Sequence, residues 1–196
     1  MDEVSATPED MIRQALEVLG KGDAELLAAL DEITAPLYVT DADGLVTYYN
    51  PACIAFAGRT PEVRADRWCV TWKLFTMDGQ YLPHDECPMA TAIKERREIR
   101  GLTAVAKRPD GSQVTFMPYP TPIVKDGALI GAVNILIDVT DVSQAAELWI
   151  QAERARRLAR GVPDDATADT LERLADEYEF KAIALGGPRA PRTSLN

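Results

Sequence analysis

The sequence predicts an α+β fold in which a small antiparallel sheet is combined with helices. Two groups of strand-forming segments are separated by a helical stretch, and glycine-containing turns join the strands within each group. Periodic apolar residues before and after this region are typical of amphipathic helices. At 196 residues and 46% hydrophobic, the chain is long enough for one core-bearing domain between helical arms.

The composition argues against several classes of function. A net charge of −10 would repel a nucleic acid from most of the surface. Cys53, Cys69 and Cys87 follow neither a disulfide nor a zinc-binding spacing, which fits a reducing compartment. The N-terminus is acidic where a signal peptide is basic, and no apolar run approaches a membrane span of about 20 residues. We therefore expect a cytoplasmic protein without nucleic-acid binding or membrane insertion.

Residues 1–30 are predicted to form two amphipathic helices. Thr7 and Pro8 are typical of a helix start, and apolar residues follow at helical spacing as far as Leu19. Asp23 can cap a second helix with Leu26 and Leu30 on its apolar stripe. Each stripe needs a partner surface, which is either the body of this chain or a second subunit.

The body of the chain, residues 31–141, changes to a strand pattern. Residues 36–40 and 45–50 predict a hairpin through Gly44, and residues 51–97 predict short helices and loops. Three further strands are expected at residues 102–107, 113–118 and 128–138.

The last strand is apolar on both faces, so both faces of the sheet should be covered. Leu129, Val133 and Ile135 are expected on one face, with Ala132 and Leu136 on the other. Prolines occupy the alternate positions 118, 120 and 122 of the preceding segment, so one side of it lacks three N–H donors in a row. Pairing on that side should fail beyond Met117.

The order of these elements and several short motifs resemble the PAS domain family, in particular PAS domains of bacterial sensory proteins. The resemblance covers about residues 31–141 and implies a five-stranded antiparallel sheet with short helices on one face. It also implies a role in signal transduction. The matching motifs are Asp43-Gly44, Tyr49-Asn50-Pro51-Ala52 with Phe56 and Gly58, the segment 78–89, Arg108-Pro109-Asp110-Gly111, the segment 118–122, and Asp138-Val139-Thr140-Asp141.

Residues 142–185 predict a C-terminal helical hairpin, followed by a disordered tail at 186–196. Asp141 and Gln144 resemble a capping box for the first helix, and Asp164 or Asp165 can cap the second. Asp138, Thr140 and Asp141 form the expected signal-transfer junction between strand and helix. The expected partner or dimer surface comprises Leu26, Leu30, Leu148, Trp149, Ala152, Leu171, Leu174 and Tyr178.

Arginines near the end of the first hairpin helix do not indicate a nucleic-acid site, because the second helix carries enough carboxylates to compensate them. Neither helix contains a histidine, so the hairpin cannot be the phosphorylated helix of a histidine kinase.

Few residues could support chemistry. A Cys/His enzyme would have to use His84, the only histidine, with Cys87, whose position near a helix start would favour a thiolate. A structural role for this motif is favoured instead. His84, followed by Gly101 at a distance similar to that in haem-binding PAS domains, leaves a haem-based gas or redox sensor as the alternative function. The Asn-Cys-Arg-Phe motif of flavin-binding light sensors is lacking, and we expect no metal site and no cofactor outside the haem alternative.

A small apolar ligand is a further possibility. Trp68, Trp72 and Phe75 would share one face of a helix, which is more typical of core than of a pocket. The full set of candidate pocket residues is Phe56, Trp68, Trp72, Phe75, Phe116 and Tyr119.

These observations favour a non-enzymatic cytoplasmic sensory or adaptor protein that signals through protein–protein interaction. The expected partners are a separate histidine kinase or other regulator and a second copy of the chain in a homodimer. Whether the helical arms serve dimerisation or output stays open at this point.

Overall fold

The computed structural model describes residues 6–21 and 29–186, and Leu26 therefore lies outside the described residues. The chain divides into two compact units after Asp138. Among the described residues no helix is long and apolar enough to span a membrane.

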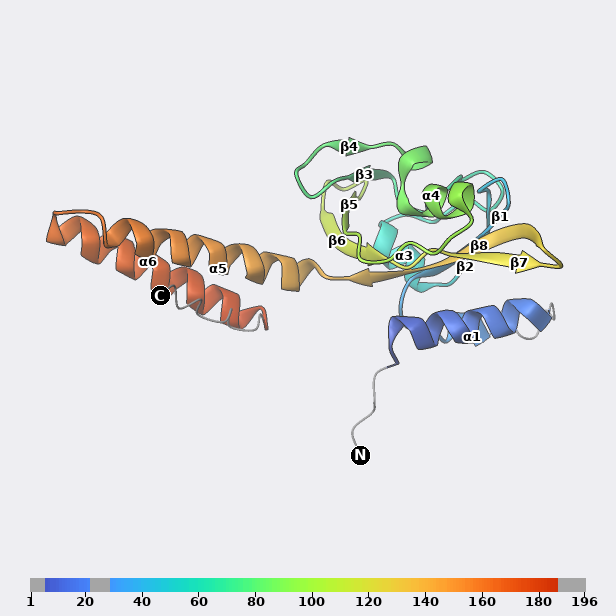
Figure 1. Ribbon diagram of the computed structural model, residues 1–196, viewed down its shortest axis with the longest axis horizontal. Coiled ribbons are helices and arrows are strands. Elements are labelled where there is room, and N and C mark those ends of the chain that lie inside the picture. The colour runs from blue at the N-terminus through green and yellow to red at the C-terminus, as the bar shows by residue number, and fades with distance from the viewer. Residues whose placement is uncertain (1–5, 22–28, 187–196) are drawn as a thin grey trace, which may run out of the picture. The chain divides into compact units, whose positions relative to one another are not determined.

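The first unit contains most of the secondary structure (Figure 1). Its elements in chain order are α1 (Pro8–Lys21), β1 (Leu37–Asp41), β2 (Val46–Tyr49), α3 (Ala52–Ala57), β3 (Lys73–Phe75), β4 (Tyr81–Leu82), the 3₁₀ helix η1 (His84–Glu86), α4 (Pro88–Glu95), β5 (Ala104–Lys107), β6 (Gln113–Pro118), β7 (Thr121–Lys125) and β8 (Ala128–Asp138).

The strands form one antiparallel sheet in the order β2-β1-β8-β6-β5-β3-β4. The long strand β8 is central: β1 pairs with it on one side, and β6 and then β7 pair with it on the other. The five expected strands are present as β1, β2, β5, β6 and β8, so the predicted α+β fold is confirmed. The described residues add β3, β4 and β7, and the predicted count of five was too low because these short strands lie within loops or follow an interrupted strand.

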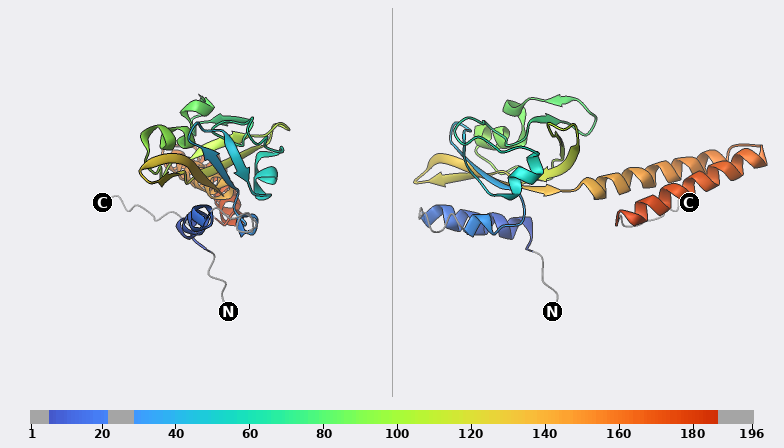
Figure 2. Two further views of the ribbon diagram at one scale, coloured as in Figure 1. Left: turned by 90° about the vertical axis from the view of Figure 1, so that its right-hand side faces the viewer. Right: turned by 180° about the vertical axis from the view of Figure 1, so that it is seen from behind.

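Helices cover both faces of the sheet, as the last strand predicts (Figures 1 and 2). On one face, α3 and α4 pack against β5, β6 and β8 through buried residues that include Phe56, Met89 and Phe116. On the other face, α1 contributes Ile12, Ala15 and Val18 to a second cluster with Leu37, Val39, Val133 and Ile135. The N-terminal helix therefore covers the second face within the same chain.

One apolar residue of β8 lies on the opposite face from the one expected. The pairing of β7 with β8 shifts register so that Ile123 lies opposite Gly131 and Val124 opposite Leu129. The extra residue at the bulge reverses the alternation of side chains. Leu129 therefore packs against the same cluster as Ala132 and Leu136, and not with Val133.

The proline pattern has the predicted effect on pairing. The ladder between β5 and β6 ends at Ala104 and Phe116, whereas β8 continues to pair with β6 as far as Pro118. Tyr119 donates its N–H to Ile135 O at 2.9 Å, so the nitrogens of Pro118 and Pro120 face away from β8. The missing donors thus lie on the β5 side, where pairing stops.

The N-terminal helix begins as predicted. The Thr7 hydroxyl accepts the Asp10 N–H at 3.2 Å, and the Asp10 carboxylate accepts the Thr7 N–H at 3.4 Å, a reciprocal cap. Leu30 is fully buried in the cluster beneath α1, which corrects its assignment to a partner surface. A stripe with a partner in its own chain is not available for a second subunit.

Buried Asn50 holds the segment that leads into β1. Its Oδ1 accepts the Leu37 N–H at 2.9 Å, and its Nδ2 donates to Ile33 O at 2.8 Å and Ala35 O at 2.9 Å. Because a buried amide without partners is costly, these bonds fix where the chain crosses from one face of the sheet to the other.

The second unit is a hairpin of two antiparallel helices, α5 (Thr140–Ala159) and α6 (Asp165–Ala184) (Figure 1). Buried alanines form the contact between the two helices, with Tyr178 packed against them; in α5 these are Ala145, Ala152, Ala155 and Ala159, and in α6 they are Ala175 and Ala182. Asp164 caps α6 as predicted and accepts the Thr167 N–H at 2.9 Å. The predicted helical hairpin is present, with small residues at its contact.

Candidate functional site

The interior between the sheet and the short helices contains two of the predicted pocket residues in direct contact. Phe56 on α3 and Phe116 on β6 are both buried, and their rings stack edge to face with centroids 5.3 Å apart. Such a contact adds roughly 0.5–1.5 kcal/mol beyond burial. Trp68 packs against the same cluster while remaining half-buried.

The prediction that Trp68, Trp72 and Phe75 share a helix face is wrong, because this segment contains no helix and ends in β3. Trp68 has a φ of 68°, and its ring lies over Gly44, where an added Cβ would be 2.2 Å from the ring. Trp72 is 43% exposed, with the Lys73 ammonium 4.3 Å from the ring centroid. Phe75 stacks edge to face on Tyr81.

Tyr119 lies on the other face of the sheet from Phe116. It packs against the cluster that α1 covers, and the Arg100 guanidinium lies 5.4 Å from its ring centroid. Arg100 also donates to Pro120 O at 3.1 Å and to the Thr121 hydroxyl at 2.9 Å. The structure therefore brings together Phe56, Phe116 and Trp68, and it places Trp72, Phe75 and Tyr119 elsewhere.

A series of buried hydrogen bonds runs through this interior. The Tyr38 hydroxyl donates to Trp68 O at 3.0 Å and accepts from Asn134 Nδ2 at 3.0 Å, while Asn134 Oδ1 accepts the Tyr119 N–H at 2.9 Å. Burial raises the pKa of Tyr38 well above its ordinary value, so the phenol is neutral. Sequence reasoning missed Tyr38 and Asn134. The sequence did contain one signal, since the Asn134 amide lies in the middle of an otherwise apolar strand.

The three cysteines are buried thiols, and the described residues contain none of them in a disulfide. Burial raises the pKa of Cys87 to about 12, and the neighbouring Cys69 adds to this effect. Burial also raises the pKa of Cys53 to about 12. The position of Cys87 at the start of α4 therefore does not produce the thiolate expected from the sequence, because desolvation outweighs the helix dipole.

His84 begins η1 at the edge of the unit. Burial lowers its pKa, and the Arg59 guanidinium lowers it further, while Asp66 and Asp85 act in the opposite direction. Arg59 pairs with Asp66 at 2.6 Å. His84 Nε2 is buried without a hydrogen-bond partner among the described residues.

Charged groups therefore lie close to the imidazole of His84: Arg59, Asp66 and Asp85 all act on its pKa. The haem alternative stays a prediction, and Soret absorption after reconstitution with haem tests it. Among the described residues no group of three His, Cys, Asp or Glu side chains is arranged to hold a metal ion.

The predicted junction residues lie where the sheet meets the hairpin in the chain. Asp138 is the last residue of β8 and still lies opposite Phe116, and Thr140 is the first residue of α5. Val139 is the N-cap and makes no side-chain capping bond, so Asp141 lies inside the first turn. The predicted Asp141 capping box is therefore absent, because the helix begins two residues earlier.

The hairpin residues predicted as a partner surface differ in exposure. Ala152 is buried between the helices, which corrects its assignment to an outer surface. Leu148, Trp149, Leu171 and Tyr178 are half-buried, and Leu174 is 37% exposed.

The predicted compensation of the α5 arginines by carboxylates of α6 is present at Arg156, whereas Arg160 pairs with Glu153 of its own helix. Arg156 on α5 binds three carboxylates of α6: Asp176 at 2.8 Å, Glu172 at 3.6 Å, and Glu179. The bonds to Glu179 and, secondly, to Asp176 raise the pKa of Arg156.

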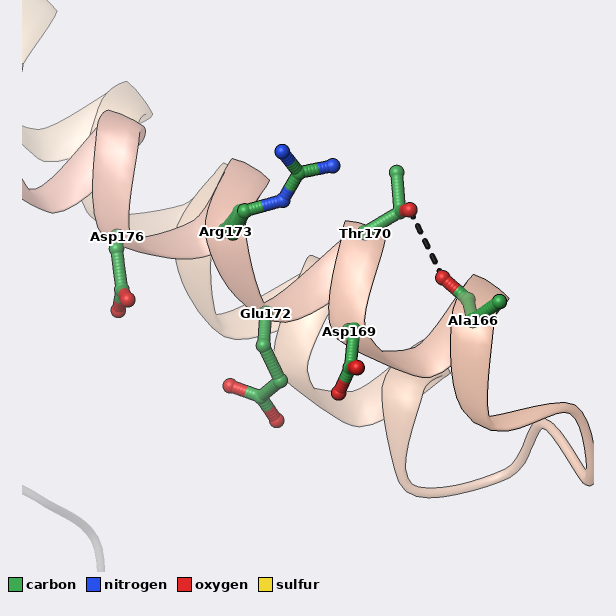
Figure 3. Close-up of a pocket in the computed structure, with 6 residues that line it drawn as sticks. All are labelled: Ala166, Asp169, Thr170, Glu172, Arg173 and Asp176. Atoms are coloured by element: carbon green, nitrogen blue, oxygen red, sulfur yellow. Dashed lines mark hydrogen bonds between the residues drawn. The ribbon is translucent and has the colours of Figure 1, made fainter.

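An open depression follows the outer side of α6 and is lined by residues of this helix alone (Figure 3). Asp169, Glu172 and Asp176 point to one side, and Thr170 and Arg173 to the other. The Thr170 hydroxyl donates to Ala166 O at 2.9 Å, and two of the carboxylates already bind Arg156. This surface is a solvated helix face.

Neither a protein-family model nor a curated protein matches this chain. Similar solved structures include the PAS domain of an HTR-like protein from Haloarcula marismortui, with 16% identity, a TM-score of 0.42, and coverage of 64% of this chain and 98% of that one. Another is the LOV domain of a blue-light-activated histidine kinase from Erythrobacter litoralis, with 19% identity, a TM-score of 0.44, and coverage of 56% and 99%. A LOV protein from Rhodobacter sphaeroides has 14% identity, a TM-score of 0.42, and coverage of 92% and 98%.

At these identities and TM-scores the likeness carries no statement about the function of this chain. The first unit contains two strands, short helices and three further principal strands in one antiparallel sheet, the order that the sequence resemblance implies. The α+β fold and the element order predicted from the sequence are confirmed.

Proposed function

We propose that this PAS-fold chain is a non-enzymatic sensory or adaptor protein that acts in the cytoplasm by binding a separate regulator, such as a histidine kinase. The observation that carries the proposal is the path of β8, which runs through the centre of the sheet and is followed after one residue by α5. Because only one residue separates β8 from α5, a shift of β8 should displace the start of the helix directly.

The interior of the first unit supports the input side of this proposal. Asn134 belongs to β8, and its amide bonds Tyr38 inside the cluster that contains Phe56 and Phe116. A small apolar or aromatic ligand that displaced these side chains would act directly on β8. The effect is a shift in population between two arrangements, within the roughly 1–3 kcal/mol typical of such coupling.

The hairpin supports the output side. Several large apolar side chains of α5 and α6 are exposed, although the helices already contact each other through alanines. Exposed apolar residues that gather on one element are typical of interaction surfaces. They are Val142, Ile150, Leu158, Leu174, Phe180 and Ile183.

The absence of catalysis is part of the proposal and is supported by the state of the reactive groups. Cys53 and Cys87 are buried with raised pKa values, and a buried thiol is a poor nucleophile at neutral pH. The single histidine is surrounded by an ion pair and has no described thiol as a hydrogen-bond partner.

Affinity capture from the native cytoplasm tests the proposed function. The full chain and a chain that ends after Thr140 serve as baits, and circular dichroism verifies that the shorter bait is folded. We expect a kinase or another regulator to be retained by the full chain and lost with the folded, shortened chain. Equal retention by both baits would contradict an output role for the hairpin.

A further inference from the structure

Large apolar residues gather on the side of the hairpin that carries the ion pair between Arg156 and Asp176. Trp149 lies seven residues before Arg156 on α5, and Ile183 lies seven residues after Asp176 on α6. Seven residues make about two turns, and the helices run antiparallel, so Trp149 and Ile183 lie at one level on this side. Phe180 lies about one turn after Asp176 on the same side. We call Trp149, Phe180 and Ile183 the tryptophan patch.

The tryptophan patch is not satisfied within the hairpin. Phe180 is 75% exposed and Ile183 is 61% exposed. Trp149 is half-buried, and its Nε1 is buried without a hydrogen-bond partner among the described residues. A buried donor without an acceptor is unfavourable, and exposed aromatic side chains beside a partly buried tryptophan are typical of the centre of an interface.

Carboxylates continue this side of α6 from the patch toward the turn of the hairpin. Asp176, Glu172 and Asp169 point to one side of the helix, and we call them the acidic row (Figure 3). Asp176 and Glu172 share the single guanidinium of Arg156. Asp169 forms no ion pair within the part of the chain that the structure describes, and Arg160 pairs within its own helix. The acidic row therefore keeps a negative charge.

The patch and the acidic row together form an elongated surface. From Asp169 to Ile183 the helix rises by about 21 Å, or about four turns. A surface that is apolar at one end and anionic at the other is complementary to a helix of similar length with apolar residues followed by lysine or arginine. A second copy in parallel register would instead set one acidic row against the other, and like charges in contact oppose association.

We propose that this surface binds an amphipathic helix of a different protein, whose apolar residues cover the tryptophan patch and whose basic residues bind the acidic row. The net charge of −10 on the chain also favours a cationic partner. This inference deepens the proposed function and rests on it for the use of the hairpin as an interaction surface.

Fluorescence anisotropy of a labelled peptide with the full chain tests the apolar contact. The probe has about 18 residues, with leucine at helical spacing in one half and lysine in the other. Phe180→Ser should weaken its binding roughly tenfold or more. The matched control is Leu158→Ser, which changes a residue that is 52% exposed and lies about 200° around α5 from Arg156. It should leave the dissociation constant unchanged.

Charge reversal tests the acidic row with the same probe. Asp169→Lys should weaken binding several-fold, and the difference should shrink in about 1 M salt because exposed charges are screened. The matched control is Glu147→Lys, which reverses an exposed carboxylate about 200° around α5 from Trp149. It should have no effect, and circular dichroism should show equal helix content in all variants.

Several results would overturn the inference. They are absence of peptide binding, equal binding of a peptide with glutamate in place of lysine, and equal losses in Phe180→Ser and Leu158→Ser. Sedimentation equilibrium supplies a further one, since a native dimer that Phe180→Ser dissociates would assign the patch to a second copy of the chain.

The outcomes separate this inference from the proposed function. A chain that fails the peptide test but still retains its regulator in affinity capture overturns the docking surface and leaves the output role intact. A chain that binds the peptide as expected but retains no regulator supports the docking surface and removes the output role.

Discussion

The interior of the first unit and the contact between the hairpin helices are built from different side chains. The first contains large residues such as Phe116, Met89 and Leu136, packed from both the sheet and the helices. The second is made of alanines, with Tyr178 as the large member. Since the hydrophobic gain follows apolar area, burial should stabilise the first unit more than the hairpin, which depends more on its ion pairs.

The largest expected effect on stability concerns the interior of the first unit, which is packed with large side chains. Phe116→Ala removes a fully buried ring and its contact with Phe56, so the free energy of unfolding should fall by about 3–5 kcal/mol. Phe180→Ala, which changes a ring that is 75% exposed in the hairpin, should alter it by no more than about 0.5 kcal/mol. Urea denaturation followed by circular dichroism measures both. Similar losses in the two variants would show that the two regions do not differ as described.

A larger side chain should be destabilising where the contact between α5 and α6 consists of small residues. Ala155→Leu places a large group between α5 and α6 and should destabilise the hairpin by about 1–3 kcal/mol. Ala146→Leu, the same change at an exposed position of α5, is the matched control and should have little effect. Hydrogen exchange of the α6 amides measures the local opening. Unchanged protection in Ala155→Leu would mean that the helices do not meet through their alanines.

The ion-pair network should contribute a smaller amount. Arg156→Met removes the guanidinium that binds Glu172, Asp176 and Glu179, and the hairpin should lose about 1 kcal/mol of stability. Arg157→Met, an exposed position without an ion pair among the described residues, controls for the substitution. The difference should shrink in 1 M salt, because exposed charges are screened. A loss that salt does not change would point to packing by the arginine stem.

The smallest expected effect concerns pH and the first unit. Burial and Arg59 lower the pKa of His84 below its ordinary value of 6.5. The unfolded chain therefore takes up a proton more readily, and this contribution to stability is lost as the pH falls through 6.5 toward the lower folded value. His84→Gln should have a thermal midpoint that declines less than that of the native chain between pH 7 and pH 5. Parallel declines would contradict a desolvated imidazole.

Local signals predicted much of the fold. The turn at Gly44, the prolines after Met117 and the cap at Asp164 each act through their neighbours in sequence, and the structure contains each of them. Strand periodicity placed β1, β2, β5, β6 and β8 for the same reason.

Longer-range effects were not accessible from the sequence. The spacing of Trp68, Trp72 and Phe75 is helical, but the packing of Trp68 on Gly44 gives that segment a different path. The bulge that moves Leu129 to the other face depends on the register of β7. Tyr38 and Asn134 are 96 positions apart, and only the folded sheet brings their side chains together.

The outer side of β7 shows how this sheet avoids strand exchange. In the described chain β7 pairs only with β8, so its other side would ordinarily recruit a strand from another molecule. Pro120 and Pro122 offer no donor, and the Arg100 guanidinium binds Pro120 O and the Thr121 hydroxyl. An incoming strand would meet missing donors and a positive charge, so the edge is unsuited to amyloid-like growth and to domain swapping. At this edge, therefore, another molecule is prevented from adding a strand to the sheet, whereas β2 and β4 form its other two edges.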